Sequence, residues 1–185
     1  MPNFRRYFVP GATYFFTVVA DGREPILCRP EARGLLREKM EECRSNRPFQ
    51  TDAIVLLPDH LHAIWTLPPD DDDYSARWAW IKKEFTKGWL GAGHEERAVS
   101  AGRARDDRRG VWQPKFWEHM VRDETDMENH FDYLHYNPVK HGYVSLPREW
   151  VWSSFHRWVR AGVYDPDWGA GEAGRFEKLA IDFGE

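Results

Sequence analysis

Four runs of apolar residues along the chain have the character of β-strands. Residues 13–20 are β-branched and aromatic and follow a Pro-Gly turn, which predicts a first strand. Residues 49–57 and 60–67 are two apolar runs separated by a Pro-Asp pair, which indicates a tight antiparallel pair. The bulky residues of 111–121 predict a fourth strand.

Apolar side chains at spacings of three and four predict helices over residues 30–46, 75–90, about 125–137 and 147–160. On the second of these, Lys82 and Lys83 lie off the apolar stripe. Asp123 or Thr125 can cap the third helix, and Pro138 is expected to end it.

The order β-α-β-β-α-β-α is typical of a ferredoxin-like α+β domain, an antiparallel sheet with helices on one face. We expect this domain to occupy residues 1–160. An irregular C-terminal tail, 161–185, follows it and could pack on or near a site. Residues 91–110 are rich in Gly, Ala, Arg and Glu without apolar periodicity, and a loop of about twenty residues is long enough to be functional.

The composition fits one globular domain but has an unusual share of aromatic residues. Ten Trp, eleven Phe and seven Tyr among 185 residues supply more ring surface than a small core needs. Either the core is rich in aromatic residues, or some rings stand at the surface and stack on unpaired bases. Trp112, Trp117 and Trp152 are the candidates for stacking.

Charge and cysteine content bear on the class of partner and on the cellular compartment. A net charge of −4 argues weakly against a nucleic-acid partner, yet Arg and Lys cluster at residues 5–6, 82–87 and 103–109, which allows a segregated basic face. Two cysteines are too few for a disulfide framework. No apolar run has the length of a signal peptide or a membrane span, so we expect a cytoplasmic protein.

The sequence PDHLHAIW, residues 58–65, carries the first candidate chemistry. On a strand alternate side chains share a face, so His60 and His62 point one way while Leu61 and Ala63 point the other. Two imidazoles at this spacing can bind one metal ion. Taken alone, such a pair is more often two half-exposed histidines.

The sequence DYLHYNPVKHG, residues 132–142, carries a second set of candidate chemical residues. Tyr133 and Asn137 are four apart and so lie one turn apart on one helix face. Asn137 could complete a metal site while Tyr133 presents its phenol to a phosphate. The spacing alone slightly favours structural roles, with Tyr133 in the core and Asn137 as a helix cap. Tyr136, on a different face, is the rival nucleophile.

Four segments in order now identify a family. RRYFVPGATYFFTV, LPDHLHAIWTLP, WQPKFWEHMVRDE and DYLHYNPVKHGYV make residues 4–160 resemble the REP-associated tyrosine transposases. The resemblance implies that His60, His62 and Asn137 bind a divalent metal, Mg²⁺ or Mn²⁺, with no small-molecule cofactor. It also implies that Tyr133 cuts and rejoins single-stranded DNA through a phosphotyrosine. The chain departs from the family pattern in its acidic charge and its long 91–110 loop.

The resemblance further implies a substrate, short imperfect palindromes folded as single-stranded DNA hairpins. The candidate DNA contacts are Arg5, Arg6, Tyr7, Lys82, Lys83 and Arg122. The protein would act as a monomer or homodimer, associated with the nucleoid when bound to DNA. Two other classes stay open, a module that binds palindromes without cutting them and an unrelated metal hydrolase that activates water and does not need Tyr133.

Overall fold

The computed structural model describes residues 6–171. Arg5 and the tail from residue 172 onward therefore lie outside the described residues. The strands are β1 (Thr13–Val19), β2 (Gln50–Leu56), β3 (His60–Thr66) and β4 (Trp117–Met120). The helices are α1 (Pro30–Asn46), α2 (Tyr74–Gly91), α3 (Ala101–Arg105), α4 (Glu124–Lys140) and α5 (Phe155–Arg160), with short 3-10 turns η1 (Asp21–Arg23) and η2 (Pro147–Glu149).

The strands form one antiparallel sheet in the order β2-β3-β1-β4. The central β1–β3 pair aligns Thr17 with His62 and Val19 with His60. This order confirms the antiparallel α+β arrangement expected from the sequence. It also places the two histidines on a central strand, where neighbouring strands fix their positions.

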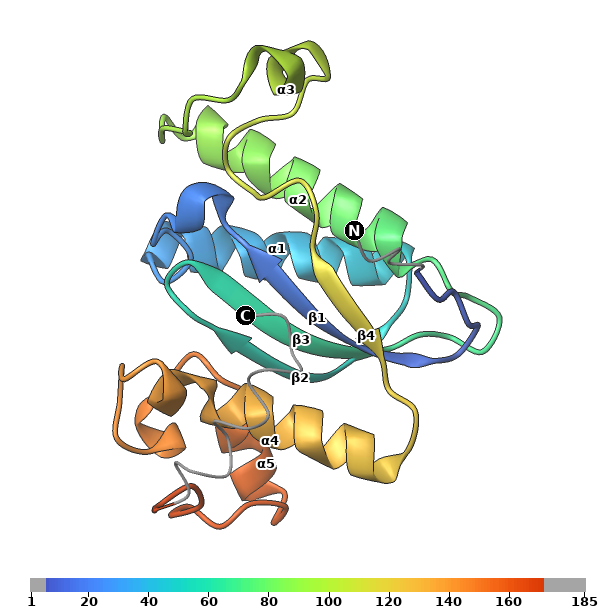
Figure 1. Cartoon of the computed structure of the whole chain (residues 1–185), viewed down its shortest axis with the longest axis vertical. Coiled ribbons are helices and arrows are strands. Elements are labelled where there is room, and N and C mark those ends of the chain that lie inside the picture. Colours follow the sequence, from blue (N-terminus) through green and yellow to red (C-terminus); the bar gives the residue numbers. More distant parts are fainter. Residues whose placement is uncertain (1–5, 172–185) are drawn as a thin grey trace.

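The helices cover both faces of the sheet, whereas the sequence led us to expect helices on one face. Figure 1 shows α1 and α2 on one side, and α4 and α5 on the other. The cause is the alternation of side chains along the strands, which places apolar residues on both faces of the sheet. Phe16 and Trp65 pack toward α1 and α2, while Phe15 and Ile64 pack toward α4. A sheet that is apolar on both faces needs a cover on each.

Aromatic residues build much of the larger core. The rings of Trp65 and Trp78 stack with centroids 4.2 Å apart, and Phe49 lies 4.1 Å from Trp65 on the other side. Trp112 is buried against Phe85. For these rings the core interpretation is confirmed.

Trp117 and Trp152 are only half-buried. Trp117 meets the edge of Phe15 on β1, and the Arg33 guanidinium lies over Trp152, 4.6 Å from the ring centroid. Both indoles already have partners in the fold. Stacking on a base stays a prediction for them.

The third predicted helix is longer than expected, because α4 continues through Pro138 to Lys140. Asp123 caps its start, accepting a hydrogen bond from the Asp126 amide at 2.9 Å. A proline in the last turn removes one backbone hydrogen bond without ending the helix. The helix ends at Lys140, and Gly142, just past the His141 cap, takes a φ of +71° that suits glycine.

Two other segments are less regular than the patterns suggested. Of residues 111–121 only Trp117–Met120 form a strand, because Pro114 cannot donate to a neighbouring strand and the Gln113 carbonyl binds Lys82 instead. Residues 147–160 form η2 and α5, separated by a stretch in which the Trp152 carbonyl and the Ser154 amide bond to the edge of β2. Within the described residues, no helix is both long and apolar enough to cross a membrane.

Candidate active site

His60 and His62 share the face of β3 that looks toward α4, as their spacing predicts. Both are buried, and their ring centroids are 5.0 Å apart. His60 Nδ1 lies 2.7 Å from Asp59 Oδ1, and His62 Nδ1 lies 3.0 Å from Thr17 Oγ1. With Nδ1–H donated to an oxygen, Nε2 is the atom that each imidazole can offer to a metal.

Asp59 keeps its negative charge behind the site. Burial raises the pKa of this carboxyl, but the hydrogen bond and charge of His60, together with Arg23, outweigh burial and bring the pKa to about 2. The Arg23 guanidinium donates to the second carboxylate oxygen at 3.0 Å. The ionised carboxylate therefore fixes the orientation of the His60 ring.

Helix α4 brings a stripe of residues, one turn apart, against the histidines. Tyr133 is 1% exposed, and its ring centroid lies 5.6 Å from that of His62. Two turns later the His141 ring lies 5.1 Å from that of His60. Asn137 stands between them on the same stripe and is fully buried. The structure thus brings Tyr133 against the two histidines, with the buried Asn137 one turn further along the same helix.

The hydroxyl of Tyr133 has a cationic neighbour that sequence reasoning missed. Lys140 Nζ donates to the Tyr133 oxygen at 2.9 Å and lies 4.9 Å from the ring centroid. The signal in the sequence was the seven-residue spacing, two helical turns, but the expected helix end at Pro138 concealed it. Tyr136, the rival nucleophile, packs instead against Trp168.

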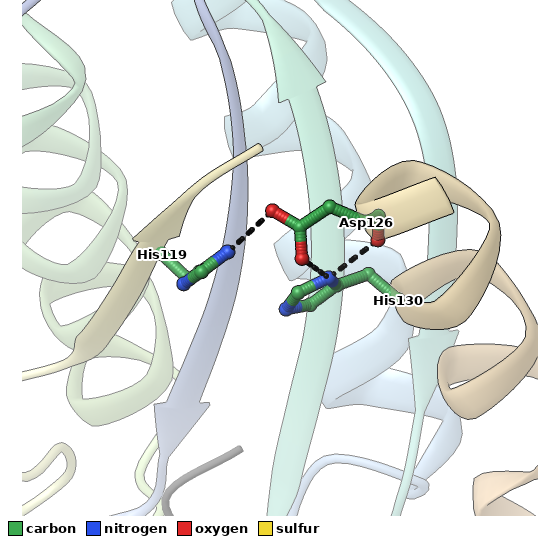
Figure 2. A group of neighbouring side chains, drawn as sticks. All are labelled: His119, Asp126 and His130. Atoms are coloured by element: carbon green, nitrogen blue, oxygen red, sulfur yellow. Dashed lines mark hydrogen bonds and ion pairs between the residues drawn. The ribbon is translucent and has the colours of Figure 1, made fainter. Parts of the chain in front are cut away.

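A second cluster of ligand-type residues lies at the start of α4 (Figure 2). One potential ligand atom from each of His119, Asp126 and His130 lies within 4.8 Å of the others. His119 Nε2 is 2.8 Å from one Asp126 oxygen, and His130 Nδ1 is 3.2 Å from the other. These three side chains could approach one cation, although neither motif pointed to them.

Arg122 already supplies a positive charge to that cluster. Its Nε and backbone amide donate to Asp126 Oδ2 at 3.1 and 2.9 Å. Burial would raise the pKa of Asp126, yet the hydrogen bonds from Arg122 and His119 hold it well below its usual range. Burial lowers the pKa of His130 to about 4. Hydrogen bonds and ion pairs within the cluster therefore already link β4 to α4 without a metal ion.

The basic residues gather in a groove on the opposite side of the sheet. A groove of about 820 Å³ runs over α2 and the segment leading to β4. Among the described residues that line it, Asp107 is the one acidic residue, and the basic ones are Arg6, Lys82, Lys83, Lys87, Arg103, Arg108, Arg109 and Lys115. Charge is thus segregated despite the net negative total. We call this surface the basic groove.

The candidate DNA contacts divide between the basic groove and other places. Arg6, Lys82 and Lys83 line it, whereas Tyr7 and Arg122 are exposed elsewhere. Lys82 is held by the Gln113 carbonyl at 2.5 Å, and burial, followed by the charges of Arg6 and Arg103, lowers its pKa to about 8. The basic cluster at 103–109, which the sequence suggested as part of a basic face but not as DNA contacts, adds Arg103, Arg108 and Arg109 to the groove.

Comparison with known proteins places the chain in a family, although no protein-family model matches it. A REP-associated tyrosine transposase of Escherichia coli K12 is 41% identical over 168 residues, 91% of each sequence. A Haemophilus influenzae protein under the same family name is 42% identical over 176 residues, 91% of this chain and 94% of that one.

A solved structure agrees with these relatives. The structure of a REP-associated tyrosine transposase bound to a REP hairpin aligns with a TM-score of 0.77 and 40% identity, covering 94% of this chain and 93% of that one. The fold is therefore that of a tyrosine transposase. The chain belongs to the REP-associated tyrosine transposases.

Proposed function

We propose that this protein cleaves and rejoins single-stranded DNA through Tyr133, beside a divalent metal held by His60, His62 and Asn137. The observation that carries the proposal is the position of the Tyr133 ring, packed against His62 with its hydroxyl on the Lys140 ammonium. The proposed nucleophile, Tyr133, and the two oriented imidazoles, His60 and His62, are thus buried next to one another.

The donor set fits a divalent cation. Two imidazoles oriented by Asp59 and Thr17 and one buried amide oxygen suit Mn²⁺ well and are compatible with Mg²⁺. When bound, the metal would withdraw charge from the scissile phosphate and orient it. The Arg122-paired cluster at His119 is the weaker candidate, because a metal there would compete with a guanidinium already in place.

The reaction needs one nucleophile and no external energy source. The Tyr133 oxygen forms a bond to phosphorus as the bond from phosphorus to the leaving DNA oxygen breaks. The phenol proton passes to water, and the leaving oxygen takes a proton from water. Because the phosphotyrosine keeps the bond energy of the phosphodiester, the reverse reaction rejoins DNA without ATP.

The substrate we propose is a hairpin with an adjoining single strand. The solved relative holds a REP hairpin, and in this chain the basic groove offers a surface for a phosphate backbone. The groove lies on the α2 side of the sheet and Tyr133 on the α4 side (Figure 1). A DNA that occupies both must pass the edge strand β4. A flexible single strand attached to a stem can do so.

Labelled hairpin DNA, incubated with the protein and Mn²⁺ or Mg²⁺ and run on a denaturing gel, tests the chemistry. Wild type should carry label on the protein band, Tyr133→Phe should not, and Tyr136→Phe should behave as wild type. Hairpin binding without any transfer of label would favour the non-cutting module. Cleavage that survives Tyr133→Phe would favour a water-activating hydrolase.

The salt dependence of hairpin binding tests the basic groove separately. Lys83→Gln and Arg108→Gln should each weaken binding and reduce the slope of log K against log salt by about 0.7 to 0.9, one phosphate contact. Lys39→Gln on α1, whose ammonium pairs with Glu38 and Glu42, is the control. Unchanged slopes in both groove variants would place the DNA elsewhere.

We also propose that a monomer suffices for cleavage, because α4 can pack Tyr133 against His62 of its own chain. Light scattering on the protein alone and with hairpin DNA would report the mass of the active species. Activity confined to a dimer would contradict this part of the proposal.

A further inference from the structure

We propose that Lys140 is a catalytic residue, whose ammonium stabilises the negative charge that the Tyr133 oxygen carries when it attacks DNA and again when it leaves. This inference rests on the proposed function, because it takes Tyr133 as the nucleophile. It goes beyond the two motifs, which assign Lys140 no task.

The contact is direct and well placed. Lys140 Nζ lies 2.9 Å from the Tyr133 oxygen, so the ammonium touches the reacting atom. The same cation lies 4.9 Å from the ring centroid, over the aromatic face. Tyr133 is almost fully buried, and a charge pair in such surroundings interacts more strongly than it would in water.

The continuation of α4 past Pro138 makes this contact possible. Residues seven apart on a helix are separated by about two turns and lie on nearly the same side. Had α4 ended at Asn137, Lys140 would not be held on the side that Tyr133 occupies. The hydrogen bond from the His141 amide to the Asn137 carbonyl, at 3.0 Å, keeps the last turn helical.

A cation at this atom assists the proposed chemistry. A phenol is a weak nucleophile near neutral pH, and its oxygen gains reactivity as it becomes negative. An adjacent ammonium favours the negative oxygen. The same ammonium stabilises the phenolate that departs when the strand is rejoined, so Lys140 should serve cleavage and rejoining alike. Its role is electrostatic, and the protons still pass to and from water.

Other charged groups near Tyr133 differ in kind from Lys140. Among the described residues, β3 brings His60 and His62, and α4 itself brings His130 one turn earlier. The neighbouring side chains of β1 and β2, Phe15 and Val55, are apolar. His62 contacts the Tyr133 ring, whereas Lys140 donates a hydrogen bond to the Tyr133 oxygen.

The test compares Lys140→Gln and Lys140→Arg in single-turnover formation of the covalent protein–DNA species. Lys140→Gln keeps a hydrogen-bond donor but loses the charge, and should slow the step about 30-fold while hairpin affinity changes less than about twofold. Lys140→Arg keeps the charge and should restore the rate to within about fivefold of wild type. Lys39→Gln controls for loss of a lysine.

A more acidic nucleophile provides the decisive measurement. Difluorotyrosine at position 133 carries negative charge more readily, so it should recover much of the rate lost in Lys140→Gln and change the wild type far less. A structural role for Lys140 would give no such recovery. A loss of hairpin affinity as large as the loss of rate would assign Lys140 to DNA binding and overturn the inference.

Failure of this inference is distinguishable from failure of the proposed function. Label transfer that survives Tyr133→Phe would reject the proposed function. Transfer abolished by Tyr133→Phe but unchanged in Lys140→Gln would reject only the role of Lys140. Circular dichroism checks folding, and if Lys140→Gln does not fold, Lys140→Met, which keeps the alkyl chain, answers the same question.

Discussion

Thr17 Oγ1 lies 3.0 Å from Nδ1 of His62, directly across the β1–β3 pair. Strand pairing therefore does more than build the sheet, because it places a side-chain oxygen behind His62, the metal ligand proposed on the next strand. An oxygen in this position fixes both the tautomer and the angle of the imidazole. Asp59 performs the same task for His60 from the turn before β3.

Replacement of Thr17 by Val should weaken metal binding. Valine has nearly the same shape but cannot hold His62 Nδ1–H, and loss of such a partner typically costs 10- to 100-fold in metal affinity. Calorimetric titration with Mn²⁺ measures the effect. Thr13→Val on the same strand, which breaks only the hydroxyl pair with Thr66, serves as the control. Equal affinities in the two variants would remove Thr17 from the site.

Asp59→Asn should reduce the rate of label transfer more than it reduces hairpin affinity. The amide keeps the shape of the carboxylate but loses the charge that orients His60. Arg23→Gln is the matched comparison, because it removes the other partner of Asp59 and leaves the carboxylate on His60. We expect the milder defect in Arg23→Gln. The opposite order would mean that Asp59 serves the turn and not the ring.

His135 should make the protein sensitive to acid. It is buried, with Nε2 2.9 Å from Ser154 Oγ, and burial lowers its pKa to about 3. Below about pH 6.5 the unfolded chain binds a proton there that the folded chain does not. The free energy of unfolding therefore decreases as the pH is lowered from about 6.5 to about 3, by up to about 1.4 kcal/mol per pH unit.

Urea unfolding at pH 7 and pH 5 measures this dependence. Wild type should lose stability over the interval, and His135→Gln should lose about 2 kcal/mol less, even if it starts lower at pH 7. His130, whose pKa burial lowers to about 4, should retain a second part of the slope in that variant. An identical pH dependence in wild type and His135→Gln would contradict the prediction.

Gly110→Ala should loosen the segment that carries the arginines of the basic groove. A Cβ at Gly110 would lie 1.9 Å from the Arg97 carbonyl oxygen, so the backbone must move. Limited proteolysis should cut the 91–116 segment faster, and hairpin binding should weaken. Gly102→Ala is the control, because its Cβ would meet nothing nearer than Ser100 Oγ at 4.0 Å. Similar proteolysis of both variants would show that the segment is already loose.

Local periodicity explains what the sequence could predict. The alternation around His60 and His62 assigns their shared face, and the spacing of Tyr133 and Asn137 assigns one helix side. Neither pattern says that α4 packs on the face of the sheet opposite to α2, because that depends on contacts distant in the sequence. The expectation of helices on one face was wrong for this reason.

Other features were hidden by a single residue or by distance in the chain. Pro138 predicts a helix end, which places Lys140 outside the helix that carries Tyr133. The basic groove joins residues from the N-terminal segment, α2 and the 103–115 stretch, which no single pattern connects. Arg6 and Lys83 could be proposed as DNA contacts from their charge, but the groove that they share could not.

The two covers of the sheet have a consequence for how such a protein can change over generations. Along β3, Leu61 and Ala63 pack toward α1 and α2, while His60 and His62 face α4 and the proposed site. With the DNA in the basic groove, as proposed, substitutions on the α2 side would alter which DNA is held without displacing the proposed reacting atoms. New target preferences can therefore arise on one half of the molecule while the other half is inherited unchanged.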